Sequence, residues 1–203
     1  MELSKVTMIL RGYNVEQVRT VAEVLLHAKY VRNMEITLNT DNAYEIIQII
    51  SNEFQGKLNI GAGTVQTYDE LKKVVDAGAK FVLSPRQMSS DMLAYCKERG
   101  IVSVPGSFTP SEIGDQFAMG ADIVKVFPAN ELSLKYAKKV CEPMGDLKLM
   151  AVGGINRENV REALDSGYKY VGTAGGLFPK NQIAQMDKEK MLISLKEFEA
   201  KLD

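Results

Sequence analysis

The feature that most constrains the fold is a regular alternation of short β-rich runs with longer amphipathic runs. Eight such pairs follow one another at a spacing of roughly 25 residues, and turn-forming residues come after nearly every β-rich run. The strands are predicted at 6–10, 33–38, 58–61, 79–83, 101–104, 120–127, 147–152 and 168–172. This pattern predicts a parallel sheet with helices on its outer face, and eight even units favour a small (β/α)8 TIM barrel.

The local signals agree with one barrel over residues 1–203, because no linker or low-complexity segment divides the chain. Asn14 is a predicted N-cap for a helix running from Val15 to Lys29. Gly63–Val65 is predicted as a turn after the third strand. A doubly wound open sheet shares the alternation and stays as the alternative fold.

Composition excludes several classes of function. The net charge is −1 and no basic run exceeds two residues, so we expect no nucleic-acid or membrane partner. Cys96 and Cys141 lie far apart and indicate free thiols, and no apolar segment has the length of a signal peptide, so a cytoplasmic protein is expected. His27 is the single histidine and cannot build a histidine metal cluster, and neither a metal nor another cofactor is expected.

The sixth strand carries Lys125 within an Ile-Val-Lys-Val-Phe run that ends before Pro128. A lysine is rarely buried without a partner, and burial lowers its pKa. A neutral amine in an apolar pocket is what Schiff-base chemistry on a ketone requires. The alternative is a lysine whose head reaches solvent at the end of the strand.

The second strand places Glu35, Thr37 and Asn39 on one face by the two-residue period of a strand. If that face points inward, a carboxylate, a hydroxyl and an amide line the mouth of the barrel, where active sites of this architecture lie. Lys125 is the predicted partner of Glu35, and a purely structural ion pair stays open.

Glycine-rich segments follow the last two strands, at Gly153–Gly154 and Gly172–Gly176. Loops at these positions of a barrel commonly bind phosphate through backbone N–H groups. The segment Gly61–Gln66 lacks the third glycine of a dinucleotide fingerprint, so a nucleotide is not expected.

Taken together, these motifs resemble a known family. The chain is similar to the class I 2-keto-3-deoxy-6-phosphogluconate and 4-hydroxy-2-oxoglutarate aldolases, which are small TIM barrels. The matching segments, in the order of the family, are Glu35–Leu38, Gly61–Val65, Leu83–Pro85, Val104–Gly106, Thr109–Glu112, Lys125–Pro128 and Val152–Gly154.

The resemblance implies a lyase that cleaves a 2-keto-3-deoxy sugar acid to pyruvate and an aldehyde such as glyceraldehyde 3-phosphate. It implies that the acid is 6-phosphorylated, of gluconate or galactonate type. Lys125 falls on the Schiff-base lysine and Glu35 on the carboxylate that moves protons. The resemblance also implies a homotrimer, because members of the family often form trimers.

The motifs extend the predicted site beyond the two catalytic residues. The expected substrate-binding residues are Arg11, Thr37, Asn39, Thr64, Pro85, Phe127, Val152, Gly153 and Gly154. The expected phosphate-binding residues are Gly154, Gly172, Thr173, Ala174 and Gly175.

Three positions depart from the gluconate-type pattern. Asn39 stands where an arginine is common, and Val152 where a threonine is common, which resembles the galactonate branch with Arg11 as a carboxylate partner. Ala174–Gly175 replaces a Gly-Ser pair, so weak discrimination for phosphate is expected, with Thr173 as the nearest hydroxyl. The alternatives are a phosphate-binding isomerase or synthase barrel, of the epimerase or thiamin-phosphate-synthase kind, and a non-catalytic sugar-acid-binding homologue.

Overall fold

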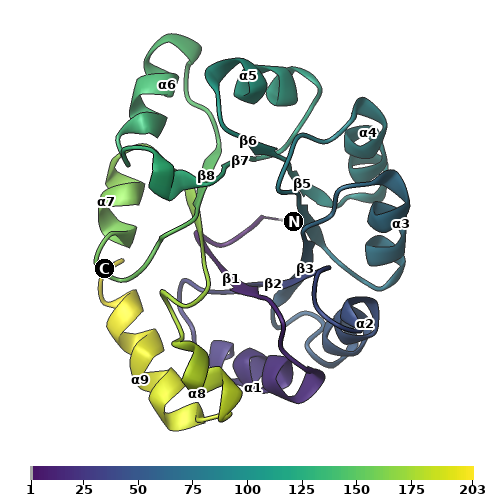
Figure 1. Ribbon diagram of the computed structural model, residues 1–203, viewed down its shortest axis with the longest axis vertical. Coiled ribbons are helices and arrows are strands. Elements are labelled where there is room, and N and C mark those ends of the chain that lie inside the picture. The colour runs from purple at the N-terminus through teal and green to yellow at the C-terminus, as the bar shows by residue number, and fades with distance from the viewer. Residues whose placement is uncertain (1) are drawn as a thin grey trace.

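The computed structural model describes residues 2–203, so Met1, the first residue of the predicted domain, lies outside the described residues. A ring of parallel strands is surrounded by helices (Figure 1). The strands are β1 Val6–Leu10, β2 Asn33–Thr37, β3 Asn59–Gly63, β4 Phe81–Leu83, β5 Val102–Val104, β6 Gly106–Ser107, β7 Val124–Val126, β8 Leu149–Val152 and β9 Tyr170–Thr173. The helices are α1 Val15–Leu25, α2 Ala43–Glu53, α3 Tyr68–Asp76, α4 Ser90–Arg99, α5 Pro110–Ala118, α6 Tyr136–Met144, α7 Val160–Asp165, α8 Lys180–Ala184 and α9 Lys188–Glu199, with a 3-10 turn η1 at Ala129–Glu131.

The eight predicted barrel strands are confirmed, because β5 and β6 are one strand interrupted at Pro105. A proline has no N–H to give to the sheet, but its carbonyl still accepts from the Lys125 N–H at 2.8 Å. Val104 accepts from Ser84 on one side, and Ser103 accepts from Ile123 on the other, so this segment joins the β4 and β7 sides of the ring. The alternative of an open doubly wound sheet is thereby excluded.

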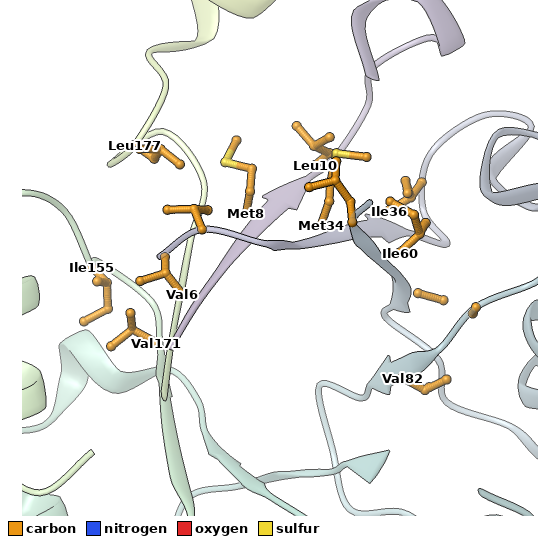
Figure 2. Close-up of a cluster of buried hydrophobic side chains, with 14 of the residues drawn as sticks. Val6, Met8, Leu10, Met34, Ile36, Ile60, Val82, Ile155, Val171 and Leu177 are labelled. Atoms are coloured by element: carbon orange, nitrogen blue, oxygen red, sulfur yellow. The ribbon is translucent and has the colours of Figure 1, made fainter. Parts of the chain in front are cut away.

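Two apolar cores lie on opposite faces of the strands. The larger core fills the space between the strands and the helices, and Figure 2 shows its outward-facing side chains on β1, β2 and β3. The smaller core lies inside the ring and includes Phe81, Leu83, Val104, Met150 and Val152. Strands covered on both faces have nearly continuous apolar sequences, which is why a polar residue such as Lys125 is conspicuous in the sequence.

Local capping sets where several helices begin. Asn14 caps α1, as predicted, and forms a capping box with Gln17. The helix ends at Leu25, four residues earlier than predicted, because the carboxylate of Glu199 in α9 accepts the backbone N–H groups of Lys29, Tyr30 and Val31. A tertiary contact therefore decides the end of this helix.

The third strand is longer than predicted and runs through Gly63. A Cβ at Gly61 would lie 2.6 Å from the ring of Phe81, and a Cβ at Gly63 would overlap the side chain of Glu35. These glycines are strand residues whose missing side chains make room for neighbours, and the turn begins only at Thr64.

Candidate active site

Lys125 lies in the middle of β7, with Val124 and Val126 facing the outer core on either side of it. Its side chain is only 5% exposed, and its Nζ lies 4.9 Å from the centroid of the Phe127 ring. Burial lowers the pKa of Lys125 to about 8; Glu35 opposes this shift and Arg11 adds to it. At pH 7 the neutral fraction of this amine is therefore about two orders of magnitude larger than that of an ordinary lysine.

Glu35 lies on β2, beside Gly61 and opposite Ile9 of β1, and its side chain is 3% exposed. The gap left by Gly63 is occupied by its carboxylate. Within residues 2–203 its Oε2 atom is buried and has no hydrogen-bond partner. Burial raises the pKa of Glu35 to about 7, and the charges of Lys125 and Arg11 oppose the shift. A carboxyl with this pKa can both give and take a proton near neutral pH.

Glu35 and Lys125 form no ion pair at contact distance among the described residues, although each charge shifts the pKa of the other. In a structural ion pair, by contrast, the ammonium and the carboxylate would lie at contact distance and neutralise each other. Both groups instead keep perturbed pKa values inside an apolar barrel, which is typical of functional sites.

An open cleft of about 620 Å³ lies where β1, β8 and β9 end. Arg11 and Lys180 are the charged residues that line it, and no carboxylate of residues 2–203 does so. Lys125 and Glu35 do not themselves line this cleft, but it reaches Ile9, which pairs with Glu35 across the sheet. A negatively charged ligand in the cleft would thus have cations around it and would lie one strand away from Glu35.

A comparison with known protein families identifies the family of this chain. Residues 1–193 match the family described as KDPG and KHG aldolase. The chain belongs to the KDPG and KHG aldolase family. The resemblance expected from the motifs is therefore confirmed, and the isomerase or synthase alternative is not supported.

Individual relatives agree with this membership. A probable 2-dehydro-3-deoxy-6-phosphogalactonate aldolase of Rhizobium meliloti is 28% identical over 193 residues, covering 95% of this chain and 90% of the relative. A 2-dehydro-3-deoxy-phosphogluconate aldolase of Pseudoalteromonas atlantica is 34% identical over 164 residues, which cover 79% of this chain and 74% of the relative. The solved KDPG aldolase of Legionella pneumophila, with pyruvate captured as a covalent carbinolamine intermediate, is 28% identical, has a TM-score of 0.84 and covers 97% of this chain and 93% of its own.

Several of the site residues predicted from the sequence line the 620 Å³ cleft of this protein. Its lining includes Arg11, Val152, Gly153, Gly154, Gly172, Thr173, Ala174 and Gly175. The Thr173 hydroxyl donates to the Ile155 carbonyl at 2.6 Å, so its proton is already engaged. That contact removes Thr173 as a free donor to a phosphate.

Other predicted residues lie at strand ends away from this cleft. Asn39 is exposed in the turn after β2, and Thr64 follows β3 in a left-handed conformation with φ 61°. Pro85 follows β4 and is half-buried. The Oγ1 atom of Thr37 lies 3.2 Å from that of Thr40.

The sequence analysis did not select Tyr13, Asn156 or Lys180, which also line the cleft. It included Gly176 only as the end of the glycine-rich segment after the last strand. Tyr13 and Asn156 come a few residues after predicted strand ends, in loops of ordinary composition. Their position at the C-terminal ends of β1 and β8 was the one available signal.

The described residues offer little for other kinds of site. Across residues 2–203 no three His, Cys, Asp or Glu side chains gather as metal ligands would. Nor does any helix in that range have the length and apolar character needed to span a bilayer.

Proposed function

We propose that this chain is a class I aldolase that cleaves a 2-keto-3-deoxy sugar acid through a Schiff base on Lys125. The observation that carries the proposal is a 5% exposed lysine with a pKa lowered to about 8, coupled to a buried carboxyl with a pKa raised to about 7. Family membership supports it, and so does the covalent carbinolamine that pyruvate forms in the Legionella pneumophila relative.

The chemistry follows from these two groups. The neutral amine of Lys125 attacks the C2 ketone, and the carbinolamine loses its hydroxyl as water with a proton from Glu35. Ionised Glu35 then takes the proton of the C4 hydroxyl, through water, and the C3–C4 bond breaks. The electron pair of that bond enters the iminium to form an enamine, and the aldehyde leaves. Protonation of the enamine and hydrolysis return pyruvate and the free amine.

The cleft supports a substrate with an anion at each end. Arg11 and Lys180 supply positive charge, and the glycine-rich loops after β8 and β9 supply backbone N–H groups. The substrate carboxylate then lies near Arg11 and a terminal phosphate near the loops of Gly154, Gly172 and Gly175.

The choice of epimer is part of the proposal. Asn39 and Val152 favour the galactonate-derived acid, since they remove an arginine and a hydroxyl of the gluconate type. Matched kcat/KM values for the two epimers test this preference, and a large gluconate advantage overturns it.

We also infer a homotrimer located in the cytoplasm. The resemblance to a family that forms trimers supports the first part, and two free cysteines, Cys96 and Cys141, support the second. Light scattering should give about three times the 22.5 kDa chain mass. A monomer mass at micromolar concentration contradicts the trimer.

Covalent trapping tests the Schiff base directly. The protein is incubated with pyruvate and borohydride, and its peptides are then analysed by mass spectrometry. We expect the reduced pyruvate adduct on Lys125. Lys180 is the internal control, because it lines the cleft but is exposed. An adduct on another lysine, or none, overturns the assignment.

A further inference from the structure

A short loop, residues 11–13, separates two open spaces at the end of β1. Arg11 and Tyr13 line the 620 Å³ cleft described above. Gly12 and Tyr13 line a second cleft of about 450 Å³ on the other side, towards α1 and α2. The loop is therefore flanked by open volume on both sides.

One hydrogen bond ties this loop to the end of β2. The Gly12 N–H donates to the Thr40 Oγ1 atom at 2.9 Å. Thr40 is 7% exposed and is itself held firmly, because its N–H donates to the Thr37 carbonyl and its carbonyl accepts from Ala43. Its hydroxyl also lies 3.2 Å from the Thr37 Oγ1 atom, so the anchor of the loop is fixed at several points.

Tyr13 packs against the outer core and holds the C-terminal side of the loop, but Arg11 and Gly12 have few further restraints among residues 2–203. Gly12 has φ 76°, and a Cβ built on it would meet no atom within 4 Å. Within residues 2–203 the guanidinium of Arg11 forms no hydrogen bond or ion pair to another side chain. The second cleft is lined by Asp41 and Glu45, which attract a cation. Without the tether, Arg11 has both the room and an electrostatic reason to turn away from the catalytic pair.

We propose that Thr40 is a positioning residue, whose hydroxyl holds the Gly12 amide so that Arg11 faces the catalytic cleft rather than the acidic second cleft. The inference rests on the proposed function, because it assigns Thr40 to the same site. Thr40 does not touch the reacting atoms and acts through the position of Arg11.

The consequence for the site is electrostatic. Arg11 lowers the pKa of both Lys125 and Glu35. The other charged or titratable groups that face the two clefts are Tyr13, Lys180, Asp41 and Glu45. Movement of Arg11 towards Asp41 and Glu45 should therefore raise both pKa values and weaken binding of the substrate carboxylate.

The test compares Thr40→Val, which removes the hydroxyl at constant volume, with Thr40→Ser, which keeps it. We expect Thr40→Val to raise KM for the sugar acid about 3- to 10-fold, the effect of losing one neutral hydrogen bond. The pH midpoint for acylation of Lys125 by acetic anhydride, read by mass spectrometry, should move upward. Thr40→Ser should match the parent protein in both measurements.

A double-mutant cycle separates positioning from a general structural role. In an Arg11→Gln background, Thr40→Val should change neither KM nor the acylation midpoint further. Equal effects in both backgrounds, or a Thr40→Val protein that matches the parent, overturn the proposal. If Thr40→Val does not fold, Thr40→Ala is measured in its place, and a folded Thr40→Ala protein with parental values is equally decisive. If pyruvate forms no adduct with the parent protein, the proposed function fails, while the acylation midpoints still decide whether Thr40 positions Arg11.

Discussion

Buried polar groups occupy both ends of the barrel interior, and they differ in how they are satisfied. At the N-terminal ends of the strands, Asn33 is 0% exposed and its amide donates to the Ser4 and Val6 carbonyls and to the Thr7 hydroxyl. Its oxygen accepts from the Ser4 N–H and from the Asn59 amide. At the C-terminal ends, the Oε2 atom of Glu35 is equally buried and has no partner among residues 2–203.

This difference indicates that the cluster around Asn33 is structural and that the Glu35 end is reactive. A buried polar network with all its members paired rigidifies the fold, whereas an unpaired buried carboxyl costs free energy unless it changes its protonation state. Glu35 and Lys125 both shift their pKa values towards the neutral form, so the C-terminal end gives up stability for reactivity. Substitutions at the two ends can test this contrast, beginning with the largest expected effect.

Lys125→Met should reduce kcat by roughly 10⁴-fold or more, as is found when an essential nucleophile is removed. Because the ammonium is already costly to bury, the variant should unfold at a temperature no lower than that of the parent. Steady-state cleavage kinetics and a thermal melt check both parts. A variant that retains appreciable turnover would place the nucleophile elsewhere.

Glu35→Gln should lower kcat by about 10²–10⁴-fold, the usual contribution of a positioned acid–base group. It should also change the dependence of stability on pH. The folded-state pKa of Glu35, about 7, is above its ordinary value of 4.5. Between pH 4.5 and 7 the carboxyl is therefore protonated in the native state and ionised in the unfolded state. The stability it contributes is present below pH 4.5 and is lost as pH rises through 7, by on the order of 3 kcal/mol.

Urea unfolding of the parent and of Glu35→Gln between pH 4.5 and 8 measures that difference. We expect the parent to lose stability over this interval relative to the variant. If the variant melts much earlier and its folded fraction keeps normal turnover, Glu35 is a structural group.

Asn33→Ala should have the opposite signature. It leaves several buried groups unpaired, so the free energy of unfolding should fall by roughly 2–4 kcal/mol. The kcat of the folded fraction should stay within about twofold of the parent value, because the cluster lies at the far end of the barrel. A large loss of kcat without a loss of stability would remove the contrast between the two ends.

The pH profile of kcat/KM should show an acid limb between pH 7 and 8. Lys125 must be neutral to attack, and Glu35 must be ionised to deprotonate the C4 hydroxyl. Activity should therefore fall about tenfold per pH unit between pH 8 and 7, and about a hundredfold per unit below pH 7, where both groups are protonated. An ordinary lysine would place the limb above about pH 10. A limb at that higher pH would mean that Lys125 is not desolvated in solution.

The smallest effect is expected at the rim of the cleft. Lys180→Gln should lower the preference for a phosphorylated substrate about 2- to 5-fold, since an exposed cation contributes modestly. Lys188→Gln is a matched control on a surface lysine that pairs with Glu23. Kinetics on a phosphorylated acid and its unphosphorylated counterpart provide the measurement. An unchanged ratio in Lys180→Gln assigns phosphate recognition to the glycine-rich loops alone.

The sequence alone was enough to predict the fold class, the start of one helix and the reactive lysine. The period of the apolar runs predicted the parallel barrel, the cap at Asn14 predicted the start of α1, and Lys125 stood out because an ion within an apolar strand has few explanations. These inferences depend on neighbours in the chain, where spacing and side-chain chemistry are visible directly.

Other features were decided only by tertiary structure. The cleft joins Arg11 and Tyr13 to Asn156 and Lys180 because β9 pairs with both β8 and β1. The pairing of β9 with β1 joins segments more than a hundred residues apart. The same holds for the space that Gly63 leaves for Glu35 and for the bond from Gly12 to Thr40. A single sequence decides which side chains are available, but burial, missing partners and the resulting pKa values arise only when distant strands come together and exclude water.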